Sequence, residues 1–191
     1  MNPRFFSVPS KQLANDAWLA RGDGSRGPRL ALVGLGMMGR EHLRVALLLG
    51  RVRIQGVYDE HPPSLEHAQR EYQALTQKPL AAYTSLDALC SDDNVDAYLI
   101  ATPNFTHSAI FERLMKTDKP IFLEKPMATS LTDAQRMVTM AKACPTFVQL
   151  GMQYRFKAQY VEAFHAIRVQ KALGTVRTVA MAEYRPPFLN K

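Results

Sequence analysis

Several features that direct a chain into a membrane or out of the cell are missing from this sequence. No apolar run approaches the roughly 20 residues that cross a bilayer, and residues 1–30 carry no apolar segment of the kind found in secretory signals. Cysteine is scarce, and Cys90 and Cys144 lie far apart without the spacing of metal ligands. We therefore expect a reduced cytoplasmic protein with no membrane partner and no bound metal.

A dense basic run is also missing, although the formal net charge is +7. Lysine and arginine are scattered along the chain without interleaved aromatic residues, which argues against a nucleic-acid partner. A positive surface also suits an anionic cofactor. At 191 residues, 47% hydrophobic and 21% charged, the chain has the composition of a globular protein with one domain and a piece of a second.

What is present is a glycine motif at the end of an apolar run. Residues 30–33 read as a strand, and Gly34-x-Gly36-x-x-Gly39 leads into a helical pattern. The first glycine permits a tight turn, the second lets the backbone approach a pyrophosphate, and the third allows close helix packing. The free amides at the start of the helix attract a diphosphate.

A second strand follows the helix and ends at an acid. Residues 52–58 form this strand, and Asp59 lies about 20 residues beyond the last glycine, where a Rossmann fold places the carboxylate that binds the adenosine ribose. The alternative is a strand-helix-strand unit in which the glycines serve packing alone and Asp59 is a turn residue.

Strands and helices continue to alternate as far as residue 150. This alternation predicts an α/β fold with a Rossmann-type doubly wound parallel sheet over residues 29–150, preceded by a flexible leader at 1–28. The predicted strands cover 30–33, 52–58, 81–84, 95–101, 120–123 and 147–150, and the predicted helices 39–49, 63–75, 85–89, 104–116 and 131–143. Ser85 and Ser130 are the expected caps of two of these helices.

The pattern changes after Gly151. Residues 157–172 predict a longer helix that ends near Gly174, and residues 176–184 alternate like a strand without a partner. We read 151–191 as the beginning of a substrate or oligomerisation domain whose remainder is absent. An unpaired strand edge would favour dimerisation or aggregation.

Two further strand ends carry polar groups. Ala101-Thr102-Pro103-Asn104 follows the fourth predicted strand, and Glu124-Lys125-Pro126 follows the fifth. Ligands of an open α/β sheet bind beyond the carboxyl ends of its strands, so both segments should face the crevice of the glycine loop.

Together these motifs resemble the Gfo/Idh/MocA oxidoreductases, over about residues 29–184. The resemblance rests on three segments in order: Gly34-x-Gly36-x-x-Gly39-x-x-His42, Ala101-Thr102-Pro103-x-x-x-His107 and Glu124-Lys125-Pro126. It implies hydride transfer between a nicotinamide cofactor and a sugar, a cyclitol or a related small molecule. It also implies a homo-oligomer in a full-length form.

The resemblance also assigns roles to residues. Lys125 matches the catalytic lysine, and Arg155 lies in a segment resembling one that enters the substrate pocket. An acid at position 59 repels a 2′-phosphate, so NAD is favoured over NADP. The residues expected to bind the cofactor are Gly34, Leu35, Gly36, Met37, Met38, Gly39, Asp59, Thr102, Pro103, Asn104, His107, Glu124 and Lys125.

Simpler interpretations remain open for several of these residues. His42 and His107 are equally consistent with packing near the sheet, and Arg155 with a surface charge. For Lys125 the alternative is a solvated lysine at the end of a strand. The Asp-x-x-x-His motif that moves the substrate proton in this family does not occur, so we expect NAD binding with little turnover. A non-catalytic dinucleotide sensor on the same fold, or a poorly folding remnant, are the alternatives.

Overall fold

The computed structural model describes residues 27–182 and Tyr184. They divide into two compact units, one ending at Met152 and the other beginning at Gln153. Most of the predicted leader, residues 1–26, lies outside the described residues.

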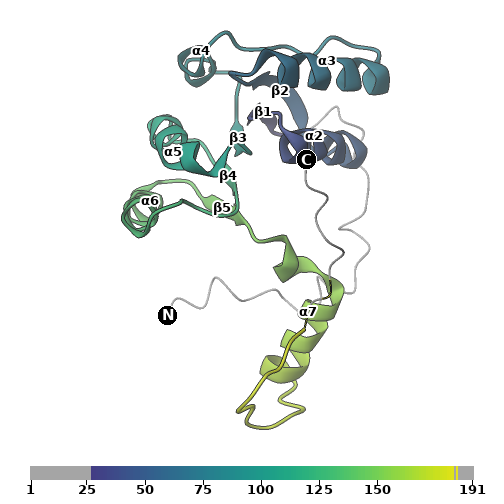
Figure 1. Ribbon diagram of the computed structural model, residues 1–191, viewed down its shortest axis with the longest axis vertical. Helices are drawn as coiled ribbons and strands as arrows, with labels where there is room; N and C mark the ends of the chain where they lie inside the picture. Colours follow the sequence, from purple (N-terminus) through teal and green to yellow (C-terminus); the bar gives the residue numbers. More distant parts are fainter. Residues whose placement is uncertain (1–26, 183, 185–191) are drawn as a thin grey trace. The chain divides into compact units, whose positions relative to one another are not determined.

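The first unit is built on five parallel strands. These are β1 (Arg29–Val33), β2 (Arg53–Tyr58), β3 (Ala97–Ile100), β4 (Ile121–Glu124) and β5 (Val148–Gly151). Their order is β2-β1-β3-β4-β5, so the chain crosses from one side of β1 to the other between β2 and β3 (Figure 1). The sheet confirms the predicted Rossmann-type α/β fold.

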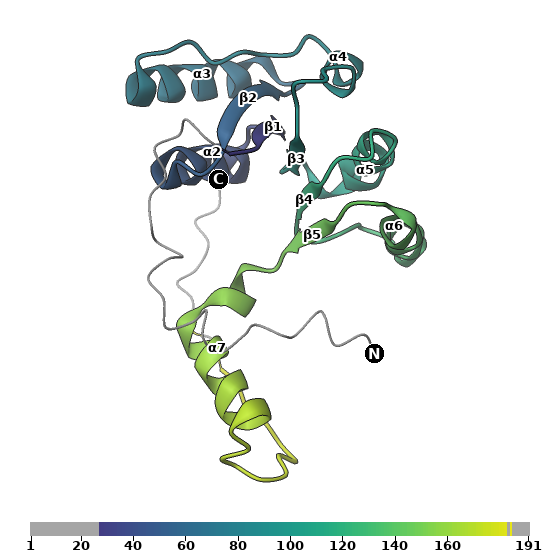
Figure 2. The same cartoon turned by 180° about the vertical axis from the view of Figure 1, so that it is seen from behind.

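Helices cover both faces of this sheet. The helices α2 (Met37–Leu49) and α3 (Pro62–Thr76) share one hydrophobic core with the sheet. The other core is closed by α4 (Leu86–Cys90), α5 (His107–Met115) and α6 (Leu131–Ala143). Figure 2 shows α5 and α6 on the side of the sheet opposite α2.

The strand sequences explain this double covering. In β1, Ala31 and Val33 belong to one core while Leu32 belongs to the other, and all three are fully buried. In β3, Ile100 and Leu99 divide between the two cores in the same way. Successive side chains of a strand point to opposite faces, so a nearly continuous apolar run requires cover on both sides.

Both predicted serine caps are confirmed. Ser85 Oγ accepts a hydrogen bond from the Ala88 amide at 3.0 Å, and Ser130 Oγ accepts one from the Asp133 amide at 3.1 Å. Each bond satisfies an amide that the first turn of a helix leaves without a partner.

The predicted strand at 81–84 is wrong, because this segment forms a single bridge to β2. Val57 donates to Ala81 O at 3.0 Å and accepts from the Tyr83 amide at 2.9 Å, and the chain then enters α4. Two hydrogen bonds at the edge of the sheet are too few for a strand, since the Ser85 cap begins the next helix immediately.

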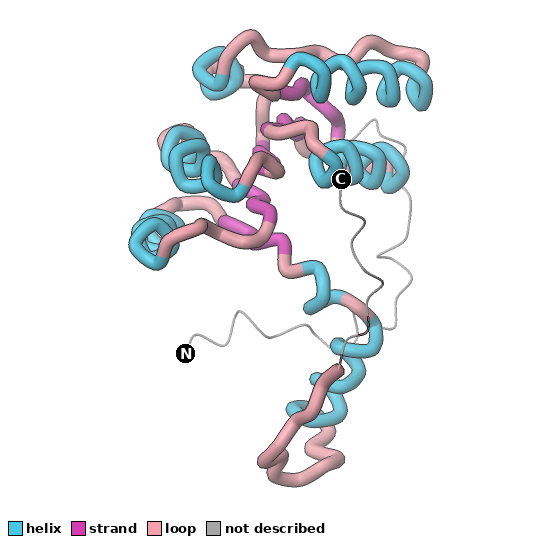
Figure 3. Tube along the Cα trace, viewed as in Figure 1, coloured by secondary structure: helices cyan, strands magenta, loops and turns pink. Residues whose placement is uncertain are grey.

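About half of the described residues of the second unit are helical, and none of residues 153–182 and Tyr184 is buried. The unit contains η4 (Gln153–Phe156), α7 (Ala158–Phe164) and the π-helical turn η5 (His165–Val169), so the predicted helix over 157–172 is shorter than expected. The predicted strand at 176–184 is wrong over the described residues 176–182 and 184, which form a loop (Figure 3). An isolated strand has no hydrogen-bonding partner to stabilise it.

Within the described part of the chain, no helix is both long enough and apolar enough to cross a membrane.

Candidate functional site

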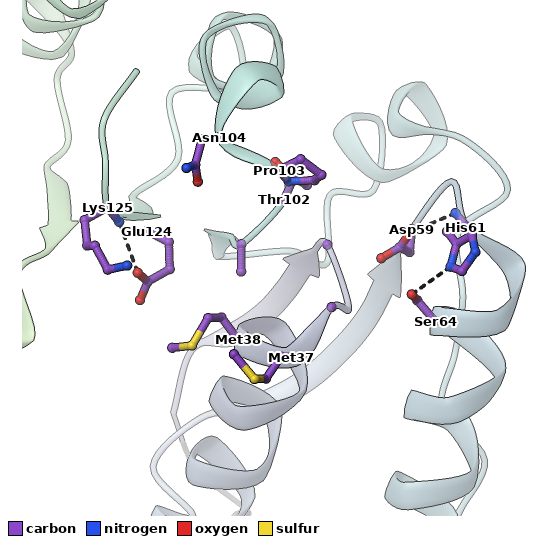
Figure 4. A pocket seen from close by; sticks show the side chains of 13 residues that line it. Met37, Met38, Asp59, His61, Ser64, Thr102, Pro103, Asn104, Glu124 and Lys125 are labelled. Atoms are coloured by element: carbon purple, nitrogen blue, oxygen red, sulfur yellow. Dashed lines mark hydrogen bonds between the residues drawn. The ribbon is translucent and has the colours of Figure 1, made fainter. Parts of the chain in front are cut away.

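A pocket of about 420 Å³ lies at the carboxyl ends of four strands. Its walls come from the segments that follow β1, β2, β3 and β4 (Figure 4). The lining residues are Gly34, Gly36, Met37, Met38, Asp59, His61, Ser64, Ala101, Thr102, Pro103, Asn104, Glu124 and Lys125. This is the edge at which parallel α/β sheets bind their ligands.

The glycine loop forms the floor of the pocket. Gly34 has a φ of +91°, and a Cβ there would lie 2.7 Å from Ala101 O. A Cβ on Gly39 would lie 1.9 Å from Gly34 O, whereas one on Gly36 would have no neighbour within 4 Å. Gly36 begins α2 without a side-chain cap, so the first amides of the helix are available to an anion.

Asp59 is held at the end of β2 by two backbone amides. Leu35 N donates to Asp59 Oδ2 at 2.6 Å, and His61 N donates to Asp59 Oδ1 at 2.8 Å. Each oxygen keeps a lone pair for a further donor. Beside it, burial raises the pKa of the Tyr58 hydroxyl, and Glu60, which accepts its hydrogen bond, raises it further.

His61 and Ser64 line the pocket beside Asp59, although neither is among the residues predicted for the site. Their side chains are joined by a hydrogen bond of 2.9 Å between His61 Nδ1 and Ser64 Oγ. His61 is the residue that precedes α3, and Ser64 lies in its first turn. The signal was available, because Pro62 and Pro63 after a strand indicate the start of a helix at the pocket edge.

The segment after β3 forms the third wall. Thr102, Pro103 and Asn104 line the pocket, and Thr106 Oγ1 donates to Thr102 Oγ1 at 2.8 Å. His107 does not line it: its side chain is fully buried, with Nδ1 2.8 Å from Pro126 O and Nε2 3.0 Å from Thr102 O. It therefore joins the segments after β3 and β4.

Glu124 and Lys125 form the fourth wall. Lys125 is exposed, whereas Glu124 is buried with 7% of its surface accessible. Glu124 Oε2 accepts a hydrogen bond from the Lys125 amide at 3.1 Å, as Figure 4 shows. Its other oxygen, Oε1, lies 2.8 Å from Nε2 of His42 on α2.

The pocket thus brings together ten of the residues predicted for the site. Leu35, Gly39 and His107 lie behind its walls, where they support the lining by backbone or buried contacts. Arg155 belongs to the second unit, in η4. The ten lining residues are Gly34, Gly36, Met37, Met38, Asp59, Thr102, Pro103, Asn104, Glu124 and Lys125.

Comparison with known proteins gives a family for this part of the chain. Residues 28–152 match the GFO_IDH_MocA family, described as an oxidoreductase family with an NAD-binding Rossmann fold. The inositol 2-dehydrogenase of Rhodococcus erythropolis is 32% identical over 142 residues, which are 73% of this chain and 39% of that protein. The 2,7-anhydro-N-acetylneuraminate hydratase of Escherichia coli is 37% identical over 113 residues, 59% of this chain and 27% of that one.

Solved structures agree with this match. The myo-inositol dehydrogenase of Lactobacillus casei, solved in complex with NAD(H) and myo-inositol, has a TM-score of 0.67 and 26% identity. That match covers 78% of this chain and 42% of the other. The chain therefore spans about two fifths of the length of such relatives.

Proposed function

The chain belongs to the Gfo/Idh/MocA oxidoreductase family, and from this membership we propose that its pocket binds NAD in preference to NADP. We further propose that the protein serves hydride transfer between NAD(H) and a hydroxyl or carbonyl carbon of a sugar, a cyclitol or a related compound. The inositol dehydrogenases among its relatives support this substrate class.

The observation that carries the proposal is the pairing of an uncapped helix start with a fixed carboxylate in one pocket. The open space over Gly36 leaves room for a pyrophosphate at the first amides of α2. Asp59, oriented by Leu35 and His61, would accept hydrogen bonds from the adenosine ribose. The same negative charge would repel a 2′-phosphate, which favours NAD.

The nicotinamide end would lie toward Glu124 and Lys125. Bound NAD supplies the hydride acceptor, and the chain supplies orientation and charge around it. Lys125 places an exposed ammonium on this wall, where it would hydrogen-bond and polarise the oxygen of the reacting carbon. Arg155 remains a proposed substrate contact.

Titration calorimetry with NAD and with NADP tests the proposal. We expect NAD to bind more tightly than NADP, and Asp59→Ala to weaken NAD binding and narrow the difference. Asp93→Ala is the matched control, because Asp93 is exposed and outside the pocket lining. Equal affinity for both nucleotides, or binding of neither by a folded chain, would contradict the proposal.

A further inference from the structure

Glu124 is a buried carboxylate whose side-chain partner comes from a distant segment. The contact between Glu124 Oε1 and His42 Nε2 is 2.8 Å long and joins residues 82 positions apart in sequence. A carboxylate removed from water is costly unless hydrogen bonds or an opposite charge compensate it. His42 is the side chain that provides this compensation on α2.

The surroundings leave this carboxylate little freedom. Gly151 lies opposite Glu124 in the pairing of β4 with β5, and a Cβ on Gly151 would be 3.0 Å from Glu124 Oε1. The ring of Phe122 packs edge-on against His42, with the centroids 5.3 Å apart and the planes at 67°. The imidazole is therefore oriented by packing as well as by its hydrogen bond.

The second oxygen of Glu124 connects this fixed carboxylate to the pocket wall. Glu124 Oε2 accepts from the backbone amide of Lys125, the residue proposed to face the reacting carbon. These contacts thus connect α2, whose first turn is the proposed pyrophosphate site, to Lys125 through His42 and Glu124.

We infer that His42 is a positioning residue: by fixing the Glu124 carboxylate, it sets the backbone of Lys125 at the nicotinamide end relative to the glycine loop. This inference rests on the proposed function for what lies against Lys125, but the connection itself is a property of the unliganded chain. It gives the last residue of Gly34-x-Gly36-x-x-Gly39-x-x-His42 a role in the site.

The test compares His42→Leu, which cannot hydrogen-bond Glu124, with His42→Gln, which can donate through its amide. His67→Leu is the matched control, because His67 is an exposed histidine on α3 outside the pocket lining. Two quantities are measured on the 191-residue chain: the hydrogen-exchange rate of the Lys125 amide by NMR without ligand, and the affinities for NAD and ADP-ribose by calorimetry. ADP-ribose lacks the nicotinamide.

We expect His42→Leu to speed exchange of the Lys125 amide and to weaken NAD binding by about tenfold, as for loss of one buried hydrogen bond. The affinity for ADP-ribose should be retained. His42→Gln should bring the exchange rate and the NAD affinity most of the way back to the values of the unsubstituted chain. His67→Leu should change neither the exchange rate nor the NAD affinity. Three results would each overturn the inference. The Lys125 amide could exchange at an unchanged rate in His42→Leu, or the affinities for NAD and ADP-ribose could fall equally. His42→Gln could also fail to restore the exchange rate and the NAD affinity.

The two proposals fail in different ways. If the unsubstituted chain binds neither NAD nor NADP, the proposed function is wrong. The exchange rate of the Lys125 amide needs no ligand, so it still decides whether His42 holds this backbone.

Discussion

The three glycines of the loop after β1 are constrained by different neighbours. Gly34 combines a left-handed φ with close contact to Ala101, and Gly39 lies against the carbonyl of Gly34. Gly36 faces open space in the pocket. The motif predicted a turn, a close approach and a packing contact in this order, but only the structure shows that Gly39 packs on the loop itself.

Alanine substitutions should separate these roles. Gly36→Ala should leave the free energy of unfolding within about 1 kcal/mol of the parent value, because its Cβ meets no other atom. Its affinity for NAD should fall about tenfold or more, because the methyl group would obstruct the proposed pyrophosphate site. Gly39→Ala should lower the free energy of unfolding by about 3 kcal/mol, because its Cβ would overlap the backbone of Gly34. Urea denaturation and calorimetry measure both, and equal stabilities for the two variants would refute this assignment.

His107 should contribute stability rather than a direct ligand contact. His107→Leu would remove the contacts of the buried imidazole with the carbonyls of Pro126 and Thr102, so we expect a loss of about 1–3 kcal/mol in the free energy of unfolding. The exposed His67→Leu serves as control. A loss below about 0.5 kcal/mol in urea denaturation would mean that these two hydrogen bonds contribute little.

Residue positions were predictable where a motif fixes the backbone, and not where a side chain acts across elements. Asp59 and Lys125 could be placed because they follow strands at one edge of the sheet. The sequence left His42 and His107 undecided between packing and function, since their partners, Glu124 and Pro126, are brought to them by tertiary structure.

At the scale of elements, Asp92 anchors the connection between α4 and β3. Its Oδ2 accepts from the Tyr83 hydroxyl at 2.7 Å and from Gln55 Nε2 at 3.1 Å, and its Oδ1 accepts from the Asn94 amide at 2.8 Å. These donors, Tyr83 foremost, lower the pKa of Asp92 to about 2. Burial raises the pKa of Tyr83, and the hydrogen bond to this carboxylate raises it further.

This anchor should make stability depend on acid pH. An Asp with an unfolded pKa of about 3.9 stabilises the fold above that pH, and the contribution is lost as the pH falls from about 4 through about 2. Asp92→Asn should therefore be less stable than the parent at pH 7, by about 1 kcal/mol or less because the group is partly exposed. The difference should shrink as the pH falls to about 2 and vanish below it. Thermal denaturation against pH, with Asp93→Asn as control, measures this, and a difference that does not shrink between pH 4 and pH 2 would contradict it.

The elements themselves were predictable where an apolar period and an end signal agree. α6 begins after Ser130 and covers the predicted residues 131–143. Both 81–84 and 176–184 carry a strand-like pattern, yet the first segment forms only one bridge and the described residues 176–182 and 184 form a loop. Pairing depends on which segments tertiary structure brings alongside, and this is not encoded in local alternation.

At the scale of the whole molecule, both hydrophobic cores lie within residues 27–152. Every buried residue of the two cores precedes Met152, whereas residues 153–182 and Tyr184 hold none. The first unit therefore has the buried surface that stability requires.

A fragment of residues 27–152 should accordingly unfold cooperatively and keep the NAD affinity of the full chain within about threefold. The pocket lining lies entirely within this fragment. Circular dichroism and calorimetry on fragment and full chain make the comparison. A non-cooperative transition, or loss of NAD binding by a folded fragment, would show that residues beyond 152 complete the unit.

The fold class and the family were predictable at this scale because three motifs occur in order at strand ends. The order of the strands was not inferred, because the crossover between β2 and β3 leaves no local signal.

That crossover also delays the completion of the sheet around β1 during protein synthesis. β1 is among the first described segments to be synthesised, yet the strand on its second side begins at Ala97. At a translation rate of about 5–20 residues per second, an interval of roughly 3–13 s separates Val33 from Ala97. During this interval one edge of β1 has no neighbour, and Gly34 lacks the Ala101 backbone against which it turns. The loop that begins at Gly34 can take its final form on the ribosome only after Ala101 has emerged.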